Sequence, residues 1–442
     1  MNREDILKSI EKNNVGFVRL QFTDINGILK NFAVSAKDIE TILAQGQSFD
    51  GSSVTGYGAI EESDFIVKPD PATYALIPWR KEHASARMLC NIYKPDGRRY
   101  EGDPRYIAQK AEKMAEDIGY IFKCGPELEF FIFRHEDGKY IPMDTGGYFD
   151  SHPGEAAEDI RRDIAENAEK FGLRIEVAHH EVAPGQQEID FRYGDLVETA
   201  DRLVTLKMLV KGSASRKGYV GSFMPKPLYG ENGSGMHVHQ SLWDIKNNCN
   251  AFYDENSTVV GNMSEVAQHF IGGQLRYGKE MSLVLASWPN SYKRLVPGYE
   301  APVHIAWAHR NRSPLMRVPD VGKRSAAARV EIRCPDPAGN PYLQFAVLCY
   351  TGLEGVRQKI ECPEPIEENV YKMSFEKRRM RGIESLPETF ADALSEFENS
   401  EIMREALGDT LFENLSRIKR HEWDEYRTHV TQWEFERYIG ML

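Results

Sequence analysis

Pairs of ionisable side chains spaced two residues apart constrain the fold of this chain more than any other feature. Glu127 and Glu129 lie in an apolar and aromatic run that predicts a strand over residues 124–133. His237 and His239 have the same spacing beside a glycine-rich turn. Side chains at positions i and i+2 of a strand point to one face of a sheet. Two carboxylates on a largely buried strand are costly unless positive groups lie beside them, so the fold has to bring cations to this face.

Two further segments carry residues of the same kind. Glu181 and Glu188 flank a Pro-Gly turn. Arg329, Glu331 and Arg333 alternate along a third predicted strand. Taken singly, each segment also fits a simpler description: a solvated acidic strand end or loop, a histidine pair satisfied in the core, or an exposed ion pair. The repetition of one spacing on several strands favours a shared site.

The candidate metal ligands are five glutamates, Glu127, Glu129, Glu181, Glu188 and Glu331, with one imidazole from the pair His237 and His239 and no thiolate. Such an oxygen-rich donor set suits Mg²⁺ or Mn²⁺ better than structural zinc. Five carboxylates exceed what one ion needs, so the set favours a site with two metals, and such sites commonly serve phosphoryl chemistry.

The stretch from residue 293 to residue 333 reverses the charge of the chain, whose formal net charge is −12. It holds nine Lys and Arg residues against three acids, Glu300, Asp320 and Glu331. Arginine binds phosphate and carboxylate groups with two parallel hydrogen bonds, so a basic cluster beside metal ligands suits phosphoryl transfer. A solvated basic face or a subunit contact is the alternative. The sequence has no GxxxxGK[ST] loop, so an ATP site has to be built in another way.

Length and composition indicate a globular protein and disfavour membrane-spanning, secreted and nucleic-acid-binding classes. A chain of 442 residues with 41% apolar residues predicts two domains with real cores. No apolar run is long enough to span a bilayer, and the charged N-terminus shows no secretory signal. The six cysteines are scattered without a CxxC pair, which favours a reducing, cytoplasmic location. The negative charge disfavours nucleic acid as a partner.

Local patterns predict the organisation of the chain. Alternating residues 17–22 and 28–34 around Asn26-Gly27 predict a β-hairpin. A polar, turn-rich stretch near residue 100 divides a domain of residues 1–102 from one of residues 103–442. Helices are expected at 104–118, 154–171 and 195–216, mainly strands and loops at 219–335, and helices again from 341 onward.

Several motifs, in this order, resemble class I glutamine synthetases along nearly the whole chain. They include Asp50-Gly51-Ser52-Ser53, Gly125-Pro126-Glu127-Leu128-Glu129-Phe130, Phe223-Met224-Pro225-Lys226-Pro227, Asn232-Gly233-Ser234-Gly235-Met236-His237, and the segments 290–302, 310–313, 335–342 and 431–438. Together these motifs are highly specific. The length resembles the short branch of the family that is not adenylylated.

The resemblance implies an α+β fold, with an N-terminal β-grasp domain and a catalytic domain built on a curved antiparallel sheet flanked by helices, as in guanidino kinases. It implies the ATP-dependent ligation of ammonia to L-glutamate through γ-glutamyl phosphate, giving L-glutamine, ADP and phosphate. Two or more Mg²⁺ or Mn²⁺ ions per site are implied. So is a homododecamer of two hexameric rings with active sites between subunits.

The resemblance also implies residue roles. The first metal, near glutamate and ammonia, would be held by Glu129, Glu181 and Glu188. The second metal, at the ATP phosphates, would be held by Glu127, His237 and Glu331. Nucleotide contacts would come from Glu176, His239, Ser241 and Arg329, and glutamate contacts from Asn232, Gly233, Arg294 and Arg333. Arg312 and Arg317 would contact the transferred phosphoryl group.

Two implied catalytic residues lie outside these groups. Asp50 of a neighbouring subunit would bind and deprotonate ammonium, and Glu300 would lie in a flap that closes over the reactive intermediate. Trp433, Phe435 and Tyr438 on the terminal helix would be buried in a partner ring or pack on their own domain. A PII-type protein or 2-oxoglutarate is a candidate regulator on family grounds.

Two departures from the family pattern concern regulation. The surroundings of Tyr371 differ from those of the adenylylated tyrosine, so we expect no adenylylation. Ala59 replaces an arginine that the short branch uses for glutamine feedback, so we expect weak inhibition by glutamine. The competing functions are a γ-glutamyl ligase for larger amines, a guanidino kinase, and a relative that has lost catalysis.

Overall fold

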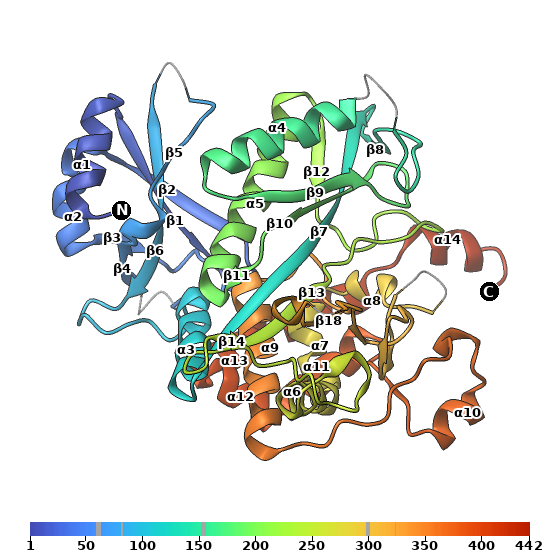
Figure 1. Cartoon of the computed structure of the whole chain (residues 1–442). Helices are drawn as coiled ribbons and strands as arrows, with labels where there is room; N and C mark the ends of the chain where they lie inside the picture. The colour runs from blue at the N-terminus through green and yellow to red at the C-terminus, as the bar shows by residue number, and fades with distance from the viewer. Residues whose placement is uncertain (59–62, 81–82, 152–155, 298–300, 323) are drawn as a thin grey trace.

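A computed structural model describes residues 1–58, 63–80, 83–151, 156–297, 301–322 and 324–442 (Figure 1). The N-terminal region contains α1 (Arg3–Lys12), β1 (Phe17–Thr23), β2 (Leu29–Ser35), α2 (Ile39–Gln45), β3 (Gln47–Asp50), β4 (Asp64–Pro69), β5 (Ala75–Leu76) and β6 (Ser85–Tyr93). Its six strands form one sheet in the order β2-β1-β6-β4-β3, with β5 paired to β6. β1 and β6 are parallel and the other pairs are antiparallel. This is the expected β-grasp domain.

The predicted hairpin is present. β1 and β2 pair from Phe17↔Ser35 to Thr23↔Leu29. Gly27 has φ +80°, and an added Cβ would lie 2.7 Å from the Asn340 Cα atom. Only glycine fits both the turn and this approach, so the hairpin turn packs tightly on the catalytic domain.

The catalytic domain is built on an eleven-stranded sheet with the main order β16-β17-β18-β13-β7-β10-β9. The strands are β7 (Tyr120–Glu136), β8 (Lys139–Pro142), β9 (Ile175–His180), β10 (Gln186–Phe191), β11 (Gly194–Asp195), β12 (Val220–Ser222), β13 (Val238–Asp244), β14 (Cys249–Asn250), β16 (Trp307–His309), β17 (Met316–Val318) and β18 (Val330–Ile332). β15 (His304–Ile305) pairs separately with β19 (Glu384–Ser385). β16 and β17 are parallel, and every other described pair in the main sheet is antiparallel.

Helices complete the domain: α3 (Pro104–Asp117), α4 (Ala156–Lys170), α5 (Leu196–Arg216), α6 (Glu265–Arg276), α7 (Gly278–Leu285), α8 (Ser291–Arg294), α9 (Pro341–Gln358), α10 (Phe375–Met380), α11 (Phe390–Glu398), α12 (Glu401–Leu407), α13 (Asp409–Thr428) and α14 (Gln432–Tyr438). α3, α5 and α9 contact one another, and α3 and α5 contact β7, the long strand across the centre of Figure 1. Leu128, Phe130 and Ile132 of β7 are fully buried in this core. The alternation of the strand therefore turns Glu127 and Glu129 to the opposite face.

Strands and loops make up most of the described part of residues 219–335, as predicted, but the prediction missed the helices α6, α7 and α8 at residues 265–294. Gly272 and Gly273 weaken the helical pattern of this segment because glycine is a poor helix former. In the folded chain they allow close packing instead. A Cβ added to Gly273 would lie 2.3 Å from the carbonyl oxygen of Thr351 in α9.

One buried guanidinium joins the two domains. Arg105 of α3 donates to Asp70 Oδ2 at 2.8 Å and Asn91 Oδ1 at 2.7 Å in the β-grasp domain. It also binds Asp201 of α5 through two hydrogen bonds, of 2.9 and 2.7 Å. Because Arg105 is only 4% exposed, these bonds form in a low-dielectric setting and hold the domains in one arrangement.

The C-terminal helix carries an exposed apolar surface. Trp433 and Phe435 of α14 are 61% and 54% exposed, and Tyr438 is 41% exposed. The alternative that these side chains pack on their own domain is therefore wrong. Among the described helices, none has both the length and the apolar character needed to cross a membrane.

Candidate functional site

The pairing register of adjacent strands places the predicted ligands side by side across the sheet. Glu188 of β10 lies opposite Glu129 of β7, and opposite His179 of β9 on its other side. His239 of β13 lies opposite Glu331 of β18. Since directly opposed residues share a face, five neighbouring strands, β18, β13, β7, β10 and β9, deliver ionisable groups to one place.

Glu127, His237 and Glu331 form one group, and each offers an atom within 4.8 Å of the others. His237 Nδ1 lies 2.8 Å from Glu127 Oε2 and 3.9 Å from Glu331 Oε1. Arg333 and Arg317 each donate to Glu331, to Oε1 and Oε2 respectively, both at 2.7 Å. We call Glu127, His237 and Glu331 the paired group, because its carboxylates already have cationic or imidazole partners.

His239 connects this group to Arg329. Arg329 Nε donates to His239 Nδ1 at 3.2 Å, so His239 Nε2 carries the hydrogen donated to Glu127 Oε1 at 2.8 Å. The pKa of Glu127 lies far below its ordinary value because hydrogen bonds from His237 and His239 outweigh the effect of burial. The guanidinium of Arg333, with His237 and His239 next, lowers the pKa of Glu331 to about 2 despite burial.

A second group consists of His179, Glu181 and Glu188, also with ligand atoms within 4.8 Å of one another. His179 Nε2 lies 3.2 Å from Glu188 Oε1. Glu129, which the sequence assigns to this metal, is adjacent but differently oriented. Its Oε2 accepts hydrogen bonds from Gln186 Nε2 at 2.8 Å and Gly235 N at 2.9 Å. We call His179, Glu181, Glu188 and the neighbouring Glu129 the acidic group.

The acidic group fits a bound divalent cation. Burial and the nearby carboxylates of Glu127 and Glu181 raise the pKa of Glu188 to about 9. Burial, followed by repulsion from Glu188 and Glu181, also raises the pKa of Glu129 well above its ordinary value. Buried carboxylates that repel one another in this way are what a metal ion would relieve. The imidazole of His179 supplies a further donor atom.

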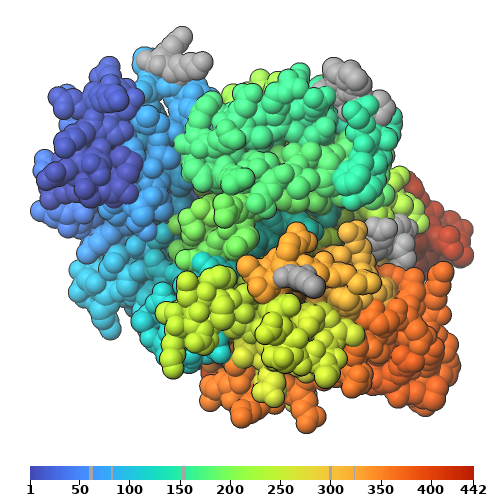
Figure 2. Space-filling view, in the orientation of Figure 1, coloured from blue at the N-terminus to red at the C-terminus, as the bar shows by residue number. Residues whose placement is uncertain are grey.

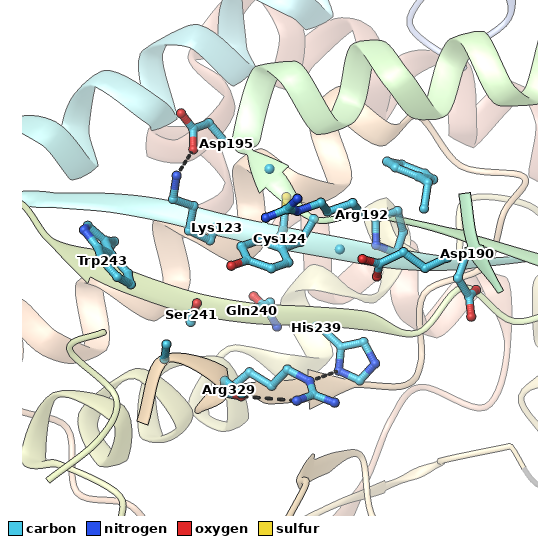
Figure 3. Close-up of a pocket in the computed structure, with 18 of the residues that line it drawn as sticks. Lys123, Cys124, Asp190, Arg192, Asp195, His239, Gln240, Ser241, Trp243 and Arg329 are labelled. Atoms are coloured by element: carbon cyan, nitrogen blue, oxygen red, sulfur yellow. Dashed lines mark hydrogen bonds and ion pairs between the residues drawn. The ribbon is translucent and has the colours of Figure 1, made fainter. Parts of the chain in front are cut away.

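A cavity of about 1330 Å³ adjoins the paired group (Figure 3). It reaches Glu127 at one end and is also lined by the four residues expected at the nucleotide, Glu176, His239, Ser241 and Arg329. In Figure 2 it opens as a recess between the green and orange surfaces, with the teal of β7 at its floor. Its position beside the metal ligands and its mixed polar lining suit a nucleotide with its phosphates at Glu127.

Residues expected at glutamate lie around Glu129. Gly233 accepts a hydrogen bond from Gln186 through its carbonyl oxygen, and a Cβ there would lie 2.2 Å from Pro225 O. Asn232 is half-buried in the same loop. Arg294 is 5% exposed and donates to the carbonyl oxygens of residues 333, 334 and 335. Its guanidinium therefore lies beneath the glycine-rich loop and stabilises the end of β18.

The other predicted catalytic residues lie in different settings. Arg317 is bound to Glu331, and Arg312 is exposed. Neither is among the described residues that line the large cavity. Asp50 is exposed at the end of β3 and accepts a hydrogen bond from Ser52 N at 2.8 Å, which lowers its pKa. Glu300 and Ala59 lie outside the described residues.

The sequence interpretation missed several residues at the site. His179 was part of the His-His-Glu run, and its i, i+2 spacing to Glu181 was the available signal. Tyr148 lies edge-on against His179, with ring centroids 5.6 Å apart. Asp190 and Tyr193 line the large cavity. Asp190 could have been found from its register opposite Glu127, but pairing is visible only after folding.

Comparisons with known proteins agree with this geometry. The family described as "Glutamine synthetase, catalytic domain" matches residues 101–438, and "Glutamine synthetase, beta-Grasp domain" matches residues 14–95. A glutamine synthetase of Methanosarcina mazei is 47% identical, with 100% of this chain and 98% of the relative covered. One from Thermotoga maritima is 46% identical, with 99% and 100% covered. A solved structure titled "GmaS/ADP complex-Conformation 1" has a TM-score of 0.90 at 28% identity, covering 99% of each chain.

Proposed function

The chain belongs to the glutamine synthetase family, and from this premise we propose how its residues carry out ATP-dependent synthesis of glutamine from glutamate and ammonia. The observation that carries the proposal is the convergence of two groups of metal ligands on one face of the sheet, one of them at the end of a nucleotide-sized cavity. The proposed intermediate is γ-glutamyl phosphate.

The paired group would hold the metal at the ATP phosphates, and the acidic group the metal near glutamate and ammonia. Bound divalent ions would neutralise phosphate charge and polarise the transferred phosphoryl group. Glu176, His239, Ser241 and Arg329 would orient the nucleotide. Arg312 and Arg317 would contact the phosphoryl oxygens, because their guanidiniums flank the acidic and paired groups respectively.

Glutamate would lie between the glycine-rich loop and the ligands. We propose contacts from Asn232, Gly233, Arg294 and Arg333. Arg333 donates to Glu331 through Nη1 at 2.7 Å, while its buried Nε has no hydrogen-bond partner among the described residues. Exclusion of water would protect the acyl phosphate from hydrolysis, and Glu300 is the proposed residue of the closing flap.

Asp50 requires a second subunit in this proposal. It is exposed on the β-grasp domain, so a neighbouring chain could place it at the ammonium position of the next site. A carboxylate there would bind the cation and accept its proton, because ammonium is not nucleophilic. The exposed apolar residues of α14 supply a surface for contact between rings. We propose a homododecamer, with a mass of about 600 kDa for chains of 50.4 kDa.

The remaining proposals concern organisation and regulation. We propose domains of residues 1–102 and 103–442, and a cytoplasmic enzyme, consistent with six free cysteines. A PII-type protein or 2-oxoglutarate is the proposed class of regulator. Weak feedback by glutamine follows from Ala59 and would be contradicted by strong inhibition at physiological glutamine concentrations.

An assay of glutamine formation with ATP, Mg²⁺, glutamate and ammonium tests the function. Wild-type protein should form glutamine and phosphate together, while Glu127→Ala should lose both products. Asp50→Ala should lose glutamine formation with ammonium. A panel of larger amines provides the competing test, and faster turnover with a polyamine would overturn the assignment of ammonium as substrate. Light scattering at about 50 kDa would overturn the oligomer.

A further inference from the structure

A buried aspartate and histidine lie directly behind the acidic group. The side chain of His180 is 1% exposed and that of Asp144 is 7% exposed. His180 Nε2 lies 2.9 Å from Asp144 Oδ1, and His180 Nδ1 lies 2.6 Å from the carbonyl oxygen of Glu181. The imidazole therefore bridges the Asp144 carboxylate and the backbone of a candidate metal ligand.

The same carboxylate oxygen also fixes the turn between β9 and β10. Asp144 Oδ1 accepts hydrogen bonds from Gly185 N at 2.7 Å and from Gly146 N at 3.3 Å. Gly185 has φ +71°, a backbone conformation that side chains disfavour. This turn separates Glu181 from Glu188, so its geometry sets the spacing of the two carboxylates.

The pair also shapes a second wall of the site. Phe149 N donates to the carbonyl oxygen of His180 at 3.1 Å. A Cβ on Gly146 would lie 2.7 Å from His180 Nε2, so the loop lies directly against the imidazole. The loop then places the rings of Tyr148 and Phe149 edge-on against His179, at 5.6 and 4.6 Å between centroids.

We propose that Asp144 and His180 are positioning residues for the metal of the acidic group. This inference rests on the proposed function. The two side chains act through the Glu181 backbone, the turn at Gly185 and the loop that carries Tyr148. Groups behind metal ligands commonly change metal affinity 10- to 100-fold, because they fix the orientation of the ligands.

Mn²⁺ binding to the full-length protein, followed by the EPR signal of free Mn²⁺, tests the proposal without an activity assay. Glu188→Gln identifies which binding class belongs to the acidic group. Asp144→Ala removes the shared acceptor and should weaken that class about 10- to 100-fold. Asp144→Asn keeps an acceptor oxygen of the same shape and should restore affinity to within about fivefold of wild type.

Two controls separate positioning from general damage. Asp150→Ala removes a carboxylate from the same loop, one that accepts a hydrogen bond from Gly147 N at 2.8 Å. It should leave Mn²⁺ affinity nearly unchanged. ADP affinity should also stay nearly unchanged in every variant, because the cavity lies on the side of the paired group. His180→Gln should resemble Asp144→Ala, and the double variant should be no worse than either single one.

The outcomes distinguish this inference from the proposed function. Wild-type protein that binds no Mn²⁺ would overturn the metal assignment and the positioning role together. Wild-type protein with two classes of Mn²⁺ sites, both unchanged in Asp144→Ala and His180→Gln, would overturn the positioning role alone. If Asp144→Ala fails to fold, a loss of affinity in His180→Gln with ADP binding retained still supports the proposal, and unchanged affinity rejects it.

Discussion

The two groups of ligands lie on the same sheet and use the same residue types, yet they are electrostatically opposite. In the paired group, Arg317, Arg333 and His239 accompany the carboxylates, and the pKa of Glu331 falls to about 2. In the acidic group, carboxylates face other carboxylates, and the pKa of Glu188 rises to about 9. The charges of the paired group are balanced by the protein itself, whereas in the acidic group burial and repulsion between carboxylates outweigh the nearby Arg312 and Arg294 until a metal binds.

Because of this difference, similar carboxylates contribute differently to folding stability and to metal binding in the two groups. Removing Glu331 from the paired group leaves the guanidiniums of Arg317 and Arg333 without their carboxylate partner, so folding and function suffer together. Removing a carboxylate from the acidic group relieves repulsion, so metal binding suffers while the metal-free fold does not. The following predictions test this contrast.

Glu331→Ala should have the largest effect. Glu331 is 1% exposed and is shared by Arg317 and Arg333, so its loss leaves two cations unpaired. We expect a loss of about 3–5 kcal/mol in the free energy of unfolding, and glutamine formation below about one thousandth of wild type. Urea unfolding without metal measures the first effect. Unchanged stability would show that the guanidiniums do not depend on this carboxylate.

Glu188→Gln should separate activity from stability. With a pKa of about 9, the Glu188 carboxyl is neutral in the metal-free protein at pH 7, and glutamine closely matches that form. Activity should fall about 100-fold or more, because a metal ligand is lost. The melting temperature without metal should equal or exceed that of wild type. On adding Mg²⁺, the variant should gain less stability than wild type, because only the site of the paired group remains intact. A metal-free variant that melts several degrees below wild type would contradict the proposed difference between the paired and acidic groups.

The pH dependence of stability should differ with and without metal. Between pH 4.5 and about 9, the folded metal-free chain retains a proton on Glu188 that the unfolded chain has released. Stability therefore falls as pH rises, by about 1.4 kcal/mol per pH unit for one such group. Asp190, whose pKa is also raised to about 9 by burial and by repulsion from Glu188, adds to the decline.

Glu331 has the opposite sign, because its stabilisation is present above pH 4.5 and is lost as pH falls toward 2. Denaturant unfolding at pH 6, 7.5 and 9, in EDTA and in Mg²⁺, measures the decline due to Glu188 and Asp190, and the Glu331 effect lies below this pH range. The decline should appear in EDTA and flatten in Mg²⁺. A flat profile in both would show that repulsion within the acidic group is already relieved.

Much of this site could be predicted from local spacing. The i, i+2 rule placed Glu127 and Glu129 on one face of β7, and the hairpin at Gly27 followed from its turn residues. The family resemblance, in turn, indicated which ligands on different strands belong to the same metal. The orientation of Glu129 toward Gln186 and Gly235 could not be predicted, because it depends on a strand 57 residues away and a loop 106 residues away.

Helices α6 and α7 were missed for a related reason. Local propensity counts Gly272 and Gly273 against a helix, whereas the close approach to α9 gives them a packing role. His179 and the Asp144–His180 pair were also not recognised, because the role of a histidine depends on the atoms that face its two ring nitrogens, and these are known only in the folded chain. Tertiary contacts, more than residue type, decide these cases.

His239→Gln should have the smallest effect and tests where the paired group ends. His239 contacts Glu127 and Arg329 but belongs to the nucleotide cavity more than to the ligand set. Glutamine can keep one of these two hydrogen bonds, so we expect a loss of about 1 kcal/mol, or roughly fivefold, expressed mainly as a higher KM for ATP. The KM for glutamate serves as the internal control and should not change. A fall in kcat of about 100-fold with KM unchanged would instead make His239 part of the metal site. The carboxylate charges of the paired group would then be balanced by His239 as well as by His237 and the two arginines.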